Sequence, residues 1–317
     1  MASIDQDLMV AIAEDYYENA LSQQKIATKY GISRMTVSNL LKRCKRDGIV
    51  EIRVNKRPSL AFALQRELQG VLKAEHVVLC PSDIETTHTR IIVGRAAADL
   101  LKRYLRDDLR IGMSYGSTLF ETVNQLSVVS RYKNIEVLQL LGALGSKYPK
   151  QDGFELARAL SEKLGGTYHI VQSPLVVQNA SLKQMLLSEP QIAETLKSAG
   201  SSDLALLGVS SNHPEISGLV RAGFLTFEES SLLYEKGVVG NVCGLHFNME
   251  GNILEHSLNE RTISISAEDL RAIPTRIGVA YGARKAEAII GALRSGFINS
   301  LVTDTDAGMR ILNLLRQ

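Results

Sequence analysis

Residues 23–46 read QQKIATKYGISRMTVSNLLKRCKR, and this stretch decides how the N-terminal part of the chain folds. Gly31 is the residue type that ends a helix in the left-handed conformation, and Ser33 is placed to cap the helix that follows. The stretch therefore predicts a helix-turn-helix. Apolar residues repeat at helical spacing on both sides of the turn: Ile26, Ala27 and Tyr30 before it, and Val37, Leu40 and Leu41 after it.

The second helix of this motif carries polar and basic residues opposite its apolar stripe. In the major groove of DNA, asparagine can pair with adenine and arginine with guanine, while serine and threonine hydroxyls suit phosphates or bases. We therefore take this face as the candidate DNA-binding surface. Its residues are Ser33, Arg34, Met35, Thr36, Ser38, Asn39, Lys42 and Arg43.

Positive charge is concentrated around the motif, although the net charge of the whole chain is only +2. Between Ser22 and Arg57 there are ten Lys or Arg residues and two acidic residues. A polyanion is the natural partner of such a segment, because neutralised phosphates release counterions. Together with the helix-turn-helix, this makes double-stranded operator DNA the expected partner. The alternative is a basic helix that is only solvated.

The segments on either side of the motif complete the first predicted domain. Apolar residues within 8–17 recur at helical spacing and predict a helix before the motif. After the turn Asp47-Gly48, residues 49–55 (IVEIRVN) alternate apolar and polar side chains and predict a short strand or wing. Pro58 then breaks the pattern. We place an all-α helix-turn-helix domain, with or without a wing, at 1–57 and a second domain at 58–317.

Composition is that of a globular protein, with 317 residues of which 45% are hydrophobic. The three cysteines, Cys44, Cys80 and Cys243, are widely spaced and lack the spacing of a metal site, which fits a reducing cytoplasm. The acidic, amphipathic N-terminus does not resemble a signal peptide, and no apolar run approaches the roughly 20 residues that span a bilayer. We expect a cytoplasmic protein without a membrane partner.

The second domain begins with a candidate connector helix at 58–73. Ser59 can cap it, and its apolar stripe consists of Leu60, Leu64, Leu68, Val71 and Leu72. A stripe this short fits a helix packed on its own domain as well as a helix that pairs between subunits.

From residue 76 onward, apolar runs alternate with helical patterns. Runs rich in Val, Ile and Leu that are apolar on both faces are typical of parallel strands with helices on both sides. We predict a Rossmann-like parallel α/β domain, with an antiparallel insertion at 240–256 around a turn at 249–251 and another strand at 262–266. The predicted strands of the parallel sheet lie at 76–80, 109–113, 135–142, 167–171, 203–209, 276–281 and 298–303, and the main helices lie near 91–105, from 117, and at 154–164, 283–294 and 306–315.

Ligands of doubly wound sheets bind beyond the carboxyl ends of the strands. The first polar strand end is IGMSYGSTL, in which Ser114, Gly116, Ser117 and Thr118 join a strand to a helix. Exposed N–H groups, the helix dipole and the hydroxyls together describe a phosphate cradle. The alternative is a structural turn that caps a helix.

Three further strand ends carry glycine or small polar residues: 142–146, which begins with Gly142, 210–212 and 281–285. Lys285 falls in the first turn of a predicted helix, where the helix dipole disfavours a cation. A bound phosphate would remove that cost, and the alternative is a solvated lysine. An enzyme would need a catalytic constellation, and no spacing among the candidate residues matches a metal or nucleophile template. These candidates are His169, His213, His246, His256, Glu155, Asp203, Glu255 and Glu260. We expect no catalytic residue, no metal and no cofactor.

The whole chain resembles the SorC family of sugar-responsive bacterial transcription regulators, which includes deoxyribonucleoside-type regulators. The resemblance is carried, in order, by the helix-turn-helix, IGMSYGSTL, VLQLLGALG, GNVCGLHFNMEG with LNERTISI, and VAYGARKAEAIIGALRSGFINSLVTD. It implies an effector domain similar to sugar-phosphate isomerases, a phosphorylated sugar effector, and a homodimer or homotetramer.

The resemblance also implies roles for single residues. Gly116, Ser117 and Thr118 correspond to the phosphate loop, and Lys285 to the basic residue across the pocket. Other positions depart from the family, because Asn248 and Asn241 replace usual Asp residues, His246 replaces a common aromatic, and Leu141 stands where one branch has a Schiff-base lysine. We therefore expect an effector that binds without a covalent bond, with Asn248 at its sugar end.

These observations predict a sequence-specific DNA-binding regulator of a carbohydrate operon, switched by a phosphorylated sugar. Two other classes of protein stay open on the sequence. One is a phosphosugar isomerase or deaminase that carries a DNA-binding appendage, and the other is a structural DNA-binding protein without a ligand.

Overall fold

The computed structural model describes residues 6–50, 60–129, 131–145 and 149–316. Contacts divide the chain into two compact units, Met1–Pro58 and Ser59–Gln317, which are described separately. The predicted wing lies largely within 51–59, outside the described residues, as does Ser146 of one predicted loop.

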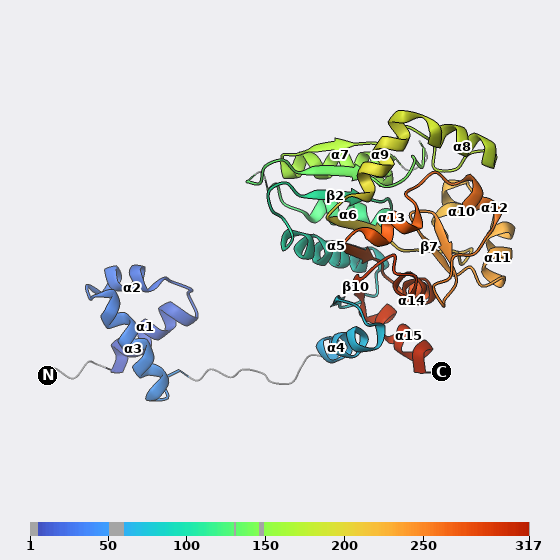
Figure 1. Ribbon diagram of the computed structural model, residues 1–317. Helices are drawn as coiled ribbons and strands as arrows, with labels where there is room; N and C mark the ends of the chain where they lie inside the picture. The colour runs from blue at the N-terminus through green and yellow to red at the C-terminus, as the bar shows by residue number, and fades with distance from the viewer. Residues whose placement is uncertain (1–5, 51–59, 130, 146–148, 317) are drawn as a thin grey trace. The chain divides into compact units, whose positions relative to one another are not determined.

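In its described residues, 6–50, the first unit contains three helices, α1 (Gln6–Tyr17), α2 (Gln23–Tyr30) and α3 (Arg34–Arg46) (Figure 1). Gly31 ends α2 at φ 64°, and the Ser33 hydroxyl accepts a hydrogen bond from the Thr36 amide at 3.0 Å, which caps α3. Both features of the predicted helix-turn-helix are confirmed. Its core is built from the apolar faces of all three helices and includes Ile12, Ile26, Val37, Leu40, Leu41 and Cys44.

A buried carboxylate fastens α1 to α2. Asp15 accepts hydrogen bonds from the Lys29 ammonium at 2.7 Å and from the Tyr30 hydroxyl at 2.8 Å. These hydrogen bonds, that from Lys29 first, lower the pKa of Asp15. The helix that precedes the motif is thus fixed against it by a polar contact as well as by apolar packing.

The second unit is built around a parallel sheet of seven strands in the order β1-β10-β9-β5-β2-β3-β4. All pairings between neighbours are parallel, as the apolar runs predicted. The strands are β1 (His76–Cys80), β2 (Arg110–Met113), β3 (Glu136–Gln139), β4 (Thr167–His169), β5 (Leu204–Gly208), β9 (Thr275–Val279) and β10 (Ser300–Asp304).

Helices cover both faces of this sheet (Figure 1). One face packs against α5 (Thr86–Lys102), α6 (Ser117–Gln125) and α7 (Gly153–Leu164). The other packs against α4 (Leu60–Leu72), α9 (Pro190–Gly200), α13 (Ala267–Ala272), α14 (Ala286–Arg294) and α15 (Thr305–Arg316). Remaining helices are α8 (Ala180–Ser188), α10 (Gly218–Ala222), α11 (Phe227–Glu235), α12 (Ser257–Arg261) and the 3₁₀ turns η1 (Pro149–Gln151) and η2 (Ala283–Lys285).

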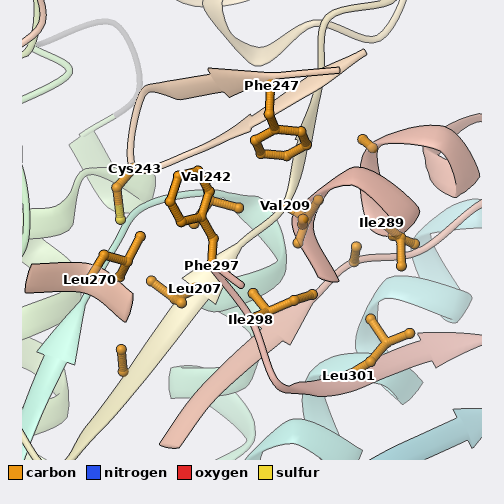
Figure 2. Close-up of a cluster of buried hydrophobic side chains, with 14 of the residues drawn as sticks. Leu207, Val209, Val242, Cys243, Phe247, Leu270, Ile289, Phe297, Ile298 and Leu301 are labelled. Carbon is orange, nitrogen blue, oxygen red and sulfur yellow. The ribbon is translucent and has the colours of Figure 1, made fainter. Parts of the chain in front are cut away.

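Alternation along single strands explains why the runs are apolar throughout. In β5, Leu204 and Leu206 face the α5 side, whereas Ala205 and Leu207 face the other side. Figure 2 shows the hydrophobic core on the face that carries Ala205 and Leu207, where Leu207 lies among side chains such as Phe297 and Ile298. A Rossmann-like parallel α/β fold is confirmed.

The predicted antiparallel insertion is present, and it contains a second turn besides the predicted one. At 249–251 the chain turns as predicted, because Phe247 bridges antiparallel to Ile253 and the Gly251 amide donates to the Asn248 carbonyl at 3.0 Å. The sheet of β6 (Ser210–Ser211), β7 (Gly240–Val242) and β8 (Leu245–Phe247) also turns at Cys243 and Gly244, with φ values of 51° and 74°. Two successive positive φ values suit a tight hairpin turn, which the apolar Cys243 concealed. Residues 262–266 do not join this sheet, because Thr262 bridges to Val176 and Ser264 to Leu141.

Two predicted helices are refined by the structure. The helix predicted at 283–294 begins as η2, so Lys285 stands at the N-cap of α14 rather than within its first turn. The connector stripe forms α4, which packs on its own unit through the fully buried Leu68. Leu68 also meets Gly308 of α15, where an added Cβ would lie 2.9 Å from the leucine.

Candidate functional site

Strand order places one crevice at the carboxyl edge of the large sheet. After β2 the chain builds outward through β3 to β4, whereas β5, β9 and β10 lead back the other way, so the order reverses between β2 and β5. Such a switch point is where ligands bind in doubly wound sheets. A cavity of about 340 Å³ lies here, and its wall includes Gly116 and Ser117 after β2 and Val209 and Ser210 after β5.

The first turn of α6 forms one wall of this cavity. Gly116 has φ 129° and ψ 164°, a conformation that is essentially restricted to glycine, and its amide donates to the Gln151 carbonyl at 3.0 Å. Among the described residues, no side chain caps the turn that begins at Ser117 and Thr118. Free amides and the positive end of the helix dipole therefore face a cavity of a size that holds a small anion.

Lys285 faces the same cavity with an enclosed ammonium group. Its Nζ donates to the Val209 carbonyl at 2.8 Å and lies 5.9 Å from the centre of the Tyr281 ring. Burial, followed by repulsion from Arg221, lowers the pKa of Lys285 to about 8. The alternative of a freely solvated lysine is therefore wrong.

Two arginines that the sequence did not single out also line the cavity. Arg90 comes from α5 and lies 3.4 Å from the Glu121 carboxylate, measured from its Nε. Arg221 comes from α10 and has no carboxylate partner among the described residues. Of the described residues that line the cavity, none is acidic. Both arginines lie within helices, away from the ends of the strands, so a search of the residues that directly follow each strand could not have found them.

Three residues predicted for the effector site are not part of the cavity wall. Ser114 is buried, and its amide donates to the Leu206 carbonyl at 3.0 Å. Gly142 packs on the Pro174 backbone, and the Asn248 side chain accepts a hydrogen bond from the Asn252 amide at 2.8 Å. The cavity brings together Gly116, Ser117, Thr118 and Lys285 from the predicted set.

The histidines considered for catalysis lie outside this cavity as well. His246 is fully buried, its ring is 4.7 Å from that of His256, and its Nδ1 is 2.9 Å from the Asn259 side-chain oxygen. Burial, followed by repulsion from His256, lowers the pKa of His246 to about 3, so its ring is neutral near pH 7. In the part of the chain that the structure describes, no group of acidic, histidine and cysteine residues could hold a metal ion.

The predicted DNA-binding face of α3 is open to solvent. Arg34, Met35, Asn39, Lys42 and Arg43 are exposed, whereas Ser38 and Thr36 are partly covered. Arg43 is paired with Asp47 at 3.0 Å. The apolar face of α3 is buried in the core of its own unit, so its polar face is the one available to a partner.

Comparisons with known proteins find a matching family for each of the two units. Residues 56–313 match a family described as "Putative sugar-binding domain", and residues 11–46 match "Sigma-70, region 4". The chain is 31% identical over 312 residues to the deoxyribonucleoside regulator of Bacillus subtilis, which covers 97% of this chain and 98% of that protein. The chain belongs to the SorC family of sugar-binding transcriptional regulators.

Other members extend this similarity to the whole chain. The transcriptional regulator LsrR of Escherichia coli K12 is 28% identical over 97% of this chain and 95% of its own length. The full-length sorbitol operon regulator SorC of Klebsiella pneumoniae has a TM-score of 0.76 at 27% identity and covers 100% of both chains. The resemblance predicted from the motifs is confirmed. No helix in the described part of this SorC-family chain is long and apolar enough to cross a membrane.

Proposed function

We propose that this chain regulates a carbohydrate operon in the cytoplasm, and that a phosphorylated sugar bound noncovalently in the α6 cavity changes its affinity for operator DNA. The observation that carries this proposal is a cationic cavity at the uncapped start of α6, lined by the half-buried Lys285 and Arg90 and by the exposed Arg221. The residues at the start of α6 and Lys285 would bind the phosphate.

Charge compensation favours an anion over a neutral sugar. The Glu121 carboxylate offsets Arg90, but Lys285 and Arg221 repel each other without an acidic residue on the cavity wall, among the residues described. A phosphate would remove this repulsion and accept hydrogen bonds from both cations. Leu141 is a fully buried apolar side chain, so the position that carries a Schiff-base lysine in one branch of the family offers no amine here.

DNA binding is assigned to the first unit and effector binding to the second. The exposed residues of α3 would enter the major groove, with their cations neutralising phosphates nearby. A single helix-turn-helix contacts one half-site, so we propose that Ser59–Gln317 holds two or four copies together. Effector binding would then shift the population of arrangements in which two α3 helices match half-sites roughly 34 Å, or one DNA turn, apart.

A thermal-shift series tests the ligand class. Pentose and hexose phosphates are compared with the same sugars without phosphate and with inorganic phosphate. At about 100 times its dissociation constant, an effector adds roughly 2.7 kcal/mol of stability. For a domain of this size, this corresponds to an increase in Tm of about 5–10 °C.

We expect this increase for at least one sugar phosphate and not for its unphosphorylated sugar. The shifted compound should also change binding to a promoter fragment in a mobility-shift assay. Stabilisation by free sugars alone would contradict the phosphate assignment, and turnover of the sugar phosphate by the pure protein would favour an enzyme.

A further inference from the structure

The first two turns of α3 carry an exposed apolar side chain, that of Met35, and an exposed side-chain amide, that of Asn39. The Met35 side chain is 73% exposed although it lies on a basic helix. Asn39, four residues later, is also exposed, and no hydrogen bond ties its amide to another described residue. Residues four apart lie one above the other on a helix, so the side chains of Met35 and Asn39 are neighbours on the same face of α3.

The remaining polar groups of the first turn are already engaged. The Ser33 hydroxyl accepts a hydrogen bond from the Thr36 amide at 3.0 Å and lies 2.8 Å from the Thr36 hydroxyl. Both hydroxyls thereby serve the helix cap. Arg34 and Met35 are the first-turn side chains left to reach a base, and of these Met35 has no charge to neutralise a phosphate.

We propose that Met35 packs on the 5-methyl group of a thymine in the operator, with Asn39 pairing to an adenine beside it. This inference rests on the proposed function, since it requires that α3 read DNA. The thymine methyl is the one apolar group that a base pair presents in the major groove. Methionine is flexible and polarisable, so it can adapt to that methyl group. Lys42, one turn further along the same face, would neutralise a backbone phosphate.

The test begins with selection from a random DNA pool by the full-length chain, with and without a mixture of pentose and hexose phosphates. Each thymine of the selected sequence is then replaced singly by deoxyuridine, which removes only the methyl group. For the wild type, we expect one replacement per half-site to weaken binding about fourfold, the factor that burial of one methyl-sized group supplies.

The variant Met35→Ala should bind the thymine and deoxyuridine duplexes equally. It keeps a good helix former at an exposed position, so the fold should be retained. The matched control is Met185→Ala, which removes an exposed methionine (59%) from α8 in the other unit and should leave the fourfold effect intact.

The inference is overturned when no thymine replacement weakens wild-type binding, or when Met35→Ala remains as sensitive to the missing methyl group as the wild type. Failure to enrich any sequence under either condition would instead contradict the proposed function and this inference with it. The two failures are therefore distinguishable.

Discussion

The two cationic surfaces of this protein differ in how their charges are placed. On α3 the cations lie in solvent, where water and salt screen them and where Asp47 offsets Arg43. In the α6 cavity, the Lys285 ammonium is enclosed and the neighbouring Arg221 repels it. Exposed cations suit a long polyanion that binds through many weak contacts, whereas an enclosed group suits one small anion of fixed position.

Ionic strength should separate the two surfaces most strongly. A protein that makes 6–10 phosphate contacts loses roughly 10³- to 10⁵-fold in DNA affinity between 50 and 200 mM salt. Enclosed charges are screened much less, so effector affinity should change less than about tenfold over the same range. Fluorescence anisotropy with operator DNA and calorimetry with the effector measure the two dependences. If operator affinity and effector affinity fell equally steeply with salt, the proposed difference between the two surfaces would be wrong.

The same contrast explains how much of each surface could be predicted. The DNA-binding face follows from local signals, because Gly31, Ser33 and the apolar stripe of α3 fix it within a short stretch. The start of α6 could also be predicted from the sequence, because Gly116 follows the end of β2. Arg90 and Arg221 could not be found in this way, because their place depends on packing between distant helices. At Gly94, for example, an added Cβ would lie 2.6 Å from Glu121, and this close approach sets Arg90 beside α6.

Substitution of the enclosed lysine should give the next largest effect. Lys285→Met keeps the length of the side chain but removes a charged donor, which should weaken effector binding roughly 10- to 100-fold. Operator affinity without effector should stay unchanged. The thermal stability of the free protein should change little, because the lost hydrogen bond to the Val209 carbonyl is offset by the removal of an enclosed cation that Arg221 repels. Calorimetry and a mobility-shift assay measure these quantities.

The matched control for this substitution is Lys197→Met, on the exposed surface of α9. It should leave effector binding unchanged. Should Lys285→Met bind the effector as tightly as the wild type, Lys285 would have no part in the site.

The smallest effect is a pH dependence confined to the cavity. Lys285 has a pKa of about 8 without ligand, and a bound phosphate favours the charged amine and raises this pKa. The affinity is therefore nearly constant around pH 7, where the amine is already protonated and the phosphate is a dianion, and it falls above pH 8 because binding must take up a proton. The decrease should approach tenfold per pH unit until the pKa of the bound state is reached. Over this range, a sugar phosphate stays a dianion, since its second pKa is about 6.

Lys285→Arg separates this linkage from other pH effects, since arginine stays protonated throughout the range. The variant should bind the effector with an affinity that does not change between pH 7 and 9.5. The arginines of α3 likewise keep their charge, so operator binding should be level over the same interval. A fall in effector affinity that persists in Lys285→Arg would place the titrating group elsewhere. The loss of that fall would instead tie the enclosed ammonium to the bound anion.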